Sequence, residues 1–193
     1  SMGSRKDEDS IAQHLYKILR ECDELAKIKI MQTQDEKKKE LKIYKNAFRR
    51  CEQLNVFENM GNANITDLGT GVFGDCRSMT NDFVNGVLQN YANNGGKKIP
   101  AYLFFGCNGQ DGHNGSDANK NKCSFTDLII PEQFSEIGDG AFASTGDAEI
   151  KLKNITVNRD MAPTCLKGET DEYAGITKKS VFDGLDPNMT TVV

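Results

Sequence analysis

The chain has 193 residues, which is enough to bury a hydrophobic core without help from disulfides or a metal. Its formal net charge is -4 at pH 7, and this acidic balance argues against a dedicated nucleic-acid binder, which usually carries a basic field. No run of 18 apolar residues occurs, so we expect no membrane span.

Histidine is scarce, because His14 and His113 are the two histidines of the chain. This side chain supplies most general bases near neutral pH and most transition-metal ligands. Neither histidine lies beside a serine or cysteine in a recognisable motif, and the six cysteines form no C-x-x-C pair. The sequence therefore predicts a protein that is not an enzyme and that holds no cofactor.

The composition divides the chain into three parts. Residues 1–7 are interpreted as a tag remnant and a disordered start, and residues 8–54 as a helical cap or arm. Residues 55–193 are rich in Gly, Asn, Asp and Thr with short apolar segments, which is typical of turns and short strands. We expect this last part to be a β-rich body with insertions.

The helical part contains two capping-box patterns, Ser10 with Gln13 and Thr33 with Glu36. Each pattern opens a stretch in which apolar residues recur at three- and four-residue steps. The second stretch runs from residue 34 to about residue 51. We therefore predict a helical hairpin.

Further elements are predicted in the β-rich body. The apolar stripe over residues 81–91 predicts a helix, which the glycines and asparagines of residues 93–96 end. Strands are predicted at residues 124–131, 149–152 and 189–193.

A polar loop over residues 108–122 lies between two of the cysteines and is expected to be solvated. Its oxygen-bearing side chains are weak candidates for Ca²⁺ ligands, but they lack the order of an EF-hand and its final Glu. We favour a solvated insertion, with no metal, over a calcium site formed by Asn108, Asp111, Asn114 and Asp117.

A short frame recurs along the chain. Residues 68–76 contain an apolar residue, three spacers, a small or branched apolar residue, a Phe, two spacers and a Cys. The Phe-equivalent positions are 48, 73, 104, 142, 162, which is Ala, and 182, and the equal last two steps suggest bare repeats without insertions. The same frame fits residues 43–51, 99–107 and 137–145, and more weakly 157–165 and 177–185.

Each copy of this frame has one apolar edge that is too small to form a core alone, so stacked copies should align their apolar, Phe and Cys positions. We call these positions the repeat ladder and expect its cysteines to be buried thiols. Its predicted members are Ile43, Phe48, Cys51, Leu68, Phe73, Cys76, Ile99, Phe104, Cys107, Ile137, Phe142, Val157, Cys165 and Phe182.

Two stretches, residues 125–142 and 65–76, resemble the BspA-type leucine-rich repeat. The consensus of that repeat is an L-x-x-I-x-I-P strand followed by V-x-x-I-G-x-x-A-F-x-x-C. The resemblance implies an α/β fold, a degenerate leucine-rich-repeat-like solenoid of short parallel strands. The predicted helical hairpin would cap it at the N-terminus.

The resemblance also implies function. It suggests a non-enzymatic recognition or adhesion protein, secreted or at the cell surface, that binds a protein or glycan partner on its strand face. No nucleic acid is expected among its partners. The insertions at 77–98 and 106–122 are the expected contact surfaces.

A second interpretation starts from the helical front. An amphipathic helix before a Gly- and Cys-containing body is also typical of a pilin or pseudopilin. That alternative predicts an α+β fold, in which one long helix packs on an antiparallel sheet and the protein is a filament subunit.

Overall fold

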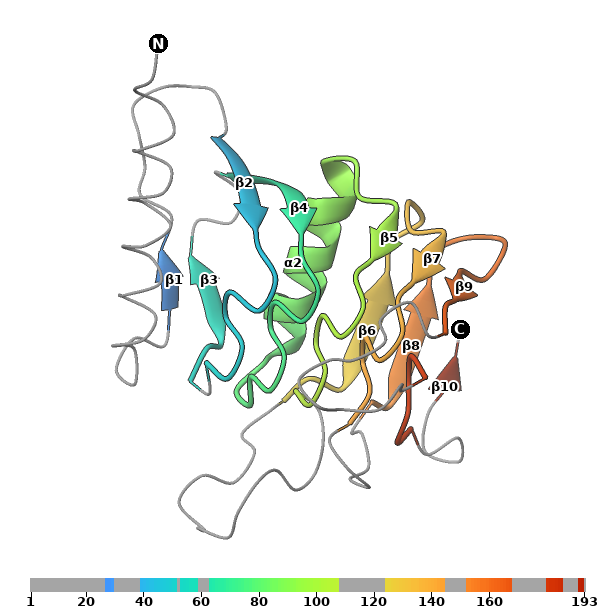
Figure 1. The fold of residues 1–193 in the computed structure, drawn as a ribbon. Helices are drawn as coiled ribbons and strands as arrows, with labels where there is room; N and C mark the ends of the chain where they lie inside the picture. Colours follow the sequence, from blue (N-terminus) through green and yellow to red (C-terminus); the bar gives the residue numbers. More distant parts are fainter. Residues whose placement is uncertain are drawn as a thin grey trace, which may run out of the picture.

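The computed structural model describes residues 27–29, 39–51, 53–58, 63–107, 124–144, 152–167, 180–185 and 191–192 (Figure 1). The five strands before residue 100 are β1 (Lys27–Lys29), β2 (Lys39–Ile43), β3 (Val56–Glu58), β4 (Ala63–Leu68) and β5 (Lys98–Ile99). Those after it are β6 (Asp127–Ile130), β7 (Glu136–Ile137), β8 (Asn154–Val157), β9 (Thr164–Cys165) and β10 (Thr191–Val192). Helix α2 spans Asn81–Asn93.

The strands form two rows, and α2 stands between β3 and β6 (Figure 1). One row holds the pair β2-β4 and the sheet β5-β7-β9, and the other holds the pair β1-β3 and the sheet β10-β8-β6. Every strand pair in the described residues is parallel. This pairing contradicts the antiparallel sheet of the pilin-like alternative and agrees with stacked repeats.

Helix α2 confirms the helix predicted over residues 81–91 and extends it to Asn93. Thr80 caps its N-terminus, because the Thr80 side chain accepts a hydrogen bond from the backbone N–H of Phe83 (3.2 Å). The apolar stripe faces the core, where Phe83, Val84, Val87, Leu88 and Ala92 are buried.

The helix lies where the other repeats have a strand. Strands β3, β6 and β8 each follow a turn of the frame, whereas α2 follows the turn that contains Phe73 and Cys76. It contacts β4 in one row and β6 in the other. An insertion in this repeat therefore replaces a two- to four-residue strand with more than three turns of helix.

The turns of the frame share one backbone conformation. The residue before each small-apolar–Phe pair has a left-handed φ, at Asn46, Gly71, Tyr102 and Gly140. A second left-handed residue follows four positions later in three of these turns, at Arg50, Asp75 and Gly106, and Gly184 is the left-handed residue of the Phe182 turn. Successive turns are joined by backbone hydrogen bonds, in which Phe48 donates to Val72, Phe73 to Leu103, Phe104 to Ala141 and Phe142 to Val181.

The phenylalanines of these turns form a continuous stack. Ring centroids are 5.6 Å apart for Phe48 and Phe73, 5.4 Å for Phe73 and Phe104, 5.9 Å for Phe104 and Phe142, and 5.5 Å for Phe142 and Phe182. The rings are nearly parallel, with interplanar angles of 6° to 15°. The stack runs through the hydrophobic core and ties each repeat to the next.

Two glycines allow the turns to pack closely. A Cβ atom on Gly138 would collide with the backbone nitrogen of Ala101 in the preceding repeat, and one on Gly69 would collide with that of Lys45. Backbone atoms cannot move aside as a flexible side chain can. Both glycines directly follow the buried apolar residue that ends a strand, so the close approach recurs at the same position of the frame.

The helix predicted from residue 34 to about residue 51 is wrong over residues 39–51. Residues 39–43 form β2, which pairs with β4, and turns of the repeat frame follow it. Ile43 and Ala47 are four residues apart, as on one side of a helix, whereas Leu41 and Ile43 are two apart, as on one side of a strand, and the pairing with β4 decides for the strand. The first predicted helix lies outside the described residues, as does most of the strand predicted at 149–152.

The weak copy at residues 157–165 does not occupy a turn of the stack. Val157 lies opposite Ile130 in the β6-β8 pair, and Cys165 lies opposite Ile137 in the β7-β9 pair. Phe142 stacks directly on Phe182, so the two equal steps form one long repeat. This copy has Ala162 at the Phe position, so it matched by the spacing of Val157 and Cys165 alone, and that spacing also fits the ends of two strands.

Candidate interaction surface

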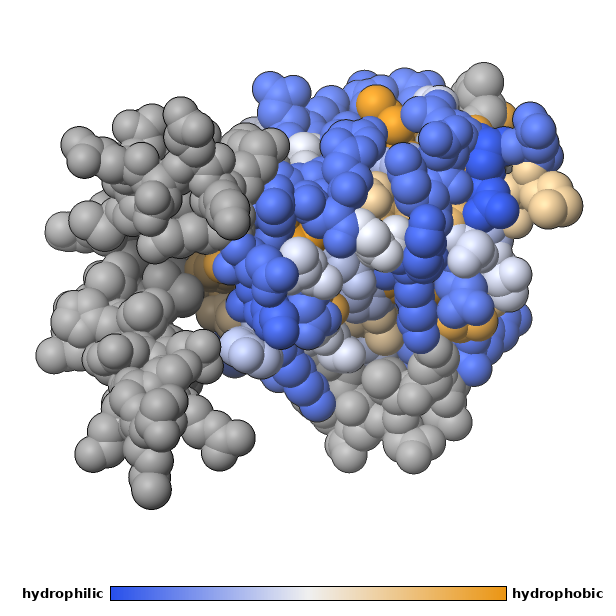
Figure 2. Space-filling model, turned by 90° about the horizontal axis from the view of Figure 1, so that it is seen from above, coloured by the Kyte–Doolittle hydropathy of each residue, from blue (hydrophilic) through white to orange (hydrophobic). Residues whose placement is uncertain are grey.

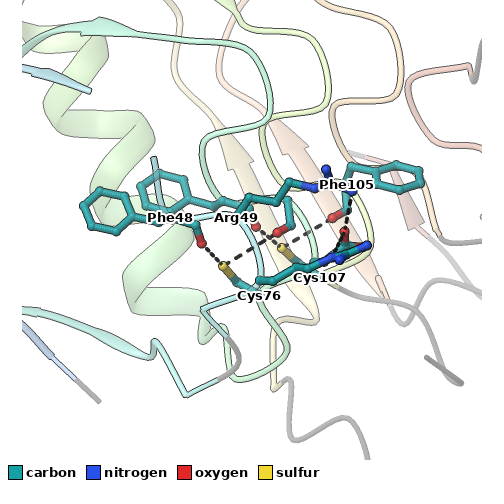
Figure 3. Close-up of polar contacts among 9 residues, drawn as sticks. Phe48, Arg49, Cys76, Phe105 and Cys107 are labelled. Carbon is teal, nitrogen blue, oxygen red and sulfur yellow. Dashed lines mark hydrogen bonds and ion pairs between the residues drawn. The ribbon is translucent and has the colours of Figure 1, made fainter. Parts of the chain in front are cut away.

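The turn cysteines lie inside the stack. The Sγ atoms of Cys76 and Cys107 each donate to the carbonyl oxygen of the Phe in the preceding turn, Phe48 and Phe73, over 2.9 Å (Figure 3). Both residues are fully buried, and Cys51, Cys76, Cys107 and Cys165 are all thiols. Burial raises the pKa of the Cys76 thiol well above its ordinary value, so this group is a poor nucleophile.

Charged side chains surround the outer part of the same turns. The guanidinium of Arg49 lies 3.4 Å from the carboxylate of Asp75, and that of Arg50 lies 3.8 Å from it. Asp75 is buried, so the two arginines compensate a charge that would otherwise be costly there. Across the described part of the chain, no group of three or more His, Cys, Asp or Glu side chains could hold a metal ion.

Side-chain amides of α2 bind the backbone of two strands, β6 and β4, as a neighbouring strand would. The Nδ2 of Asn85 donates to the carbonyl of Asp127, and its Oδ1 accepts from the N–H of Ile129, both over 2.9 Å. Asn90 binds β4 in the same way, since it donates to Ala63 (3.0 Å) and accepts from Ile65 (2.9 Å). Each amide therefore binds the carbonyl of one residue and the N–H two residues later, as a peptide group of a parallel neighbour would.

A third amide extends this network across the sheet. The Oδ1 of Asn81 accepts from the N–H groups of Thr126 (2.8 Å) and Asp127 (3.1 Å), and its Nδ2 donates to the Asp127 carboxylate (2.9 Å). That carboxylate also accepts from Thr126 Oγ1 (2.6 Å) and from Asn154 Nδ2 (2.5 Å) on β8. Hydrogen bonds from Thr126, Asn154 and Asn81 lower the pKa of Asp127, so the carboxylate is charged at neutral pH.

The outer face of β6 and β8 adjoins these amides. Ile129 is 40% exposed although its neighbours in the strand, Leu128 and Ile130, are buried. Thr156 lies directly opposite Ile129 on β8, on the same outward side. We call this face the α2–β6–β8 surface and define it as Asn81, Asn85, Asp127, Ile129, Asn154 and Thr156.

Few large apolar side chains are exposed in the described residues. Within the described residues they are Tyr44, Val56, Ile129, Met161 and Val192. Figure 2 shows a mostly hydrophilic face with scattered apolar atoms, seen from the end of the molecule at the top of Figure 1. Ile129 differs from the other four because its polar neighbours are held in place by the hydrogen bonds of α2.

The predicted sites are distributed as follows. The ladder residues of the Phe48, Phe73, Phe104 and Phe142 turns come together with Phe182, and Val157 and Cys165 lie in strands instead. Helix α2 lies within the predicted contact insertion at 77–98. Asn108, Asp111, Asn114 and Asp117, both histidines and residues 108–122 lie outside the described residues.

The asparagines of α2 were not among the predicted site residues. The available signal was their spacing, because residues 81 and 85 are one helical turn apart and so lie on one side of the helix. That spacing indicates a polar face of the helix. The strand that this face binds, β6, is more than 40 residues away in sequence and cannot be identified from the helix alone.

No helix in the described residues is long and apolar enough to cross a membrane. The comparison with curated proteins and the comparison with solved structures each found no match. The family model for the BspA type leucine rich repeat region, in six copies, matches residues 8–109 and 115–162. Leucine-rich-repeat domains generally bind proteins, and this type is typically found on bacterial cell surfaces. With most of its length matched and its turns stacked in parallel, the chain belongs to the BspA-type leucine-rich-repeat family.

Proposed function

We propose that this protein is a non-enzymatic recognition protein, secreted or at the cell surface, that binds a protein or glycan through the α2–β6–β8 surface. The observation that carries the proposal is the exposed Ile129 side chain within a network of fixed polar groups. An interface needs an apolar anchor surrounded by polar side chains that confer specificity, and this surface has both.

Rigidity supports this choice of surface. Asn81 and Asn85 belong to a helix whose opposite side is buried in the core, so their amides have little freedom to move. Asp127 is held by neighbours on α2, β6 and β8. Because binding costs the entropy of every side chain that it orders, a surface ordered in advance binds more tightly than a mobile one.

Recognition by the repeat stack also agrees with the chemistry of the buried groups. Burial raises the pKa of the Cys76 thiol, and the two arginines Arg49 and Arg50 lie beside the Asp75 carboxylate. These groups stabilise the stack, whereas the polar groups of the α2–β6–β8 surface remain available at the exterior.

The test is binding to a panel of immobilised extracellular proteins and glycans, read by surface plasmon resonance. We expect at least one specific binder, and we expect Ile129→Arg to weaken its binding at least tenfold. Tyr44→Arg is the matched control, because Tyr44 is 67% exposed and directly follows β2, which belongs to the other row of strands. Equal loss in both variants, or no loss in Ile129→Arg, would show that the partner binds elsewhere.

A further inference from the structure

The thiols of Cys51 and Cys76 occupy the same position in two adjacent turns. These turns are held together by backbone hydrogen bonds from Phe48 to Val72 (2.9 Å) and from Arg50 to Gly74 (2.8 Å). The backbone N–H of Cys51 (3.1 Å) and the Sγ of Cys76 (2.9 Å) both donate to one atom, the carbonyl oxygen of Phe48. The two cysteines are therefore immediate neighbours across the interface between repeats.

The thiols of Cys51, Cys76 and Cys107, which we call the thiol row, differ in their exposure to solvent. Cys51 is half-buried at the first turn of the described residues, whereas Cys76 and Cys107 are fully buried. Cys76 and Cys107 are neighbours in the same way. The Sγ of Cys107 and the backbone N–H of Cys76 both donate to one atom, the carbonyl oxygen of Phe73. A dissolved oxidant can therefore reach the row at Cys51, and the neighbouring thiol in the row is that of Cys76.

We propose that Cys51 and Cys76 are a site of disulfide formation that joins the Phe48 and Phe73 turns of the stack under oxidising conditions. Glutathione disulfide is a sufficient oxidant. The Cys51 thiolate attacks it and forms a mixed disulfide, which releases one glutathione. The Cys76 thiolate then attacks the Cys51 sulfur and expels the second glutathione, so two protein thiols are oxidised and one glutathione disulfide is reduced to two thiols.

Proximity supports the second step. Backbone hydrogen bonds join the turns of Cys51 and Cys76 as they join neighbouring parallel strands, which lie roughly 5 Å apart, within the Cα range that a disulfide spans. Burial raises the pKa of the Cys76 thiol, so this second step should be slower than the first and should accelerate as the pH rises. The proposal goes beyond the proposed function and does not depend on a binding partner.

The experiment treats the folded full-length chain with glutathione disulfide, blocks the remaining thiols by alkylation and maps the peptides without reduction. Cys22 and Cys123 are replaced by serine in every sample, so that pairing is limited to the four described cysteines. We expect a linked peptide pair that contains Cys51 and Cys76, and alkylated Cys107. Cys165, which is exposed, serves as an internal reference for a thiol that reacts with glutathione alone.

Two variants make the result specific. Cys107→Ser should retain the linked pair, and Cys51→Ser should lose it and leave Cys76 alkylated. A parallel sample unfolded in urea should give mixed pairings, which shows whether the folded structure selects the partner. The proposal is overturned if Cys51 accumulates as a stable glutathione adduct while Cys76 stays a thiol, or if Cys76 pairs with Cys107.

Discussion

Replacement of Asn85 by Ala tests whether side-chain amides of α2 substitute for a strand. The change removes two hydrogen bonds to β6, one to the carbonyl of Asp127 and one from the N–H of Ile129. Each is worth about 1 kcal/mol net, and partial exposure lets water bind the released groups. Alanine gains roughly 0.6 kcal/mol in helix propensity over asparagine. The expected net loss in the free energy of unfolding is therefore about 1.5 kcal/mol.

The measurement is urea unfolding followed by circular dichroism, with the slope of the transition checked for equality between variants. Gln89→Ala is the matched control, because Gln89 is an exposed residue of the same helix that hydrogen-bonds only Asn93 among the described residues. It should stay within about 0.5 kcal/mol of the parent protein. If Asn85→Ala is as stable as this control, the amide bridges do not hold β6 against the helix and the reasoning is wrong.

Three further predictions concern the stack and its surface. Phe73→Ala should lower the unfolding free energy by about 3–5 kcal/mol, because the ring of Phe73 stacks on two neighbouring rings. Phe182→Ala should lower it by less than half as much, because Phe182 is half-buried and stacks on Phe142. Urea unfolding of both variants checks the ratio. Gly138→Ala should lower the melting temperature by more than about 5 °C, because its Cβ meets the backbone of Ala101, and an unchanged melting temperature would contradict the close packing of the turns. The Asp127 carboxyl has a lowered pKa in the folded state, so its contribution to stability is present above about pH 4 and is lost as the pH falls through that lowered pKa. Asp127→Asn should therefore show a smaller loss of stability between about pH 6 and about pH 3 than the parent protein, measured by urea unfolding at each pH.

Much of the stack could be predicted from local patterns. The frame placed Phe48, Phe73, Phe104 and Phe142 in equivalent positions, and the structure stacks these four rings together with Phe182. The frame succeeds because these four turns share one conformation, in which a left-handed residue is followed by an apolar residue and then by a buried Phe. These requirements are local, so they leave a signal within nine residues.

The failures concern contacts that are distant in sequence. Ile43 fits a helix with Ala47 and a strand with Leu41, and the choice depends on β4, which lies beyond a turn and a second strand. Val157 and Cys165 matched the frame by spacing alone, although their partners are Ile130 and Ile137. The amide bridges of Asn85 and Asn90 require knowledge of which strand is missing, and this follows only from the assembled stack.

The central claim is that the chain recognises its partner through the α2–β6–β8 surface, and hydrogen exchange with a panel member that binds tests it most directly. We predict that binding slows amide exchange in residues 81–93, 127–130 and 154–157 and leaves β2 and β4 unchanged. Slower exchange confined to residues 39–43 and 63–68, with none in α2, β6 or β8, would contradict the claim.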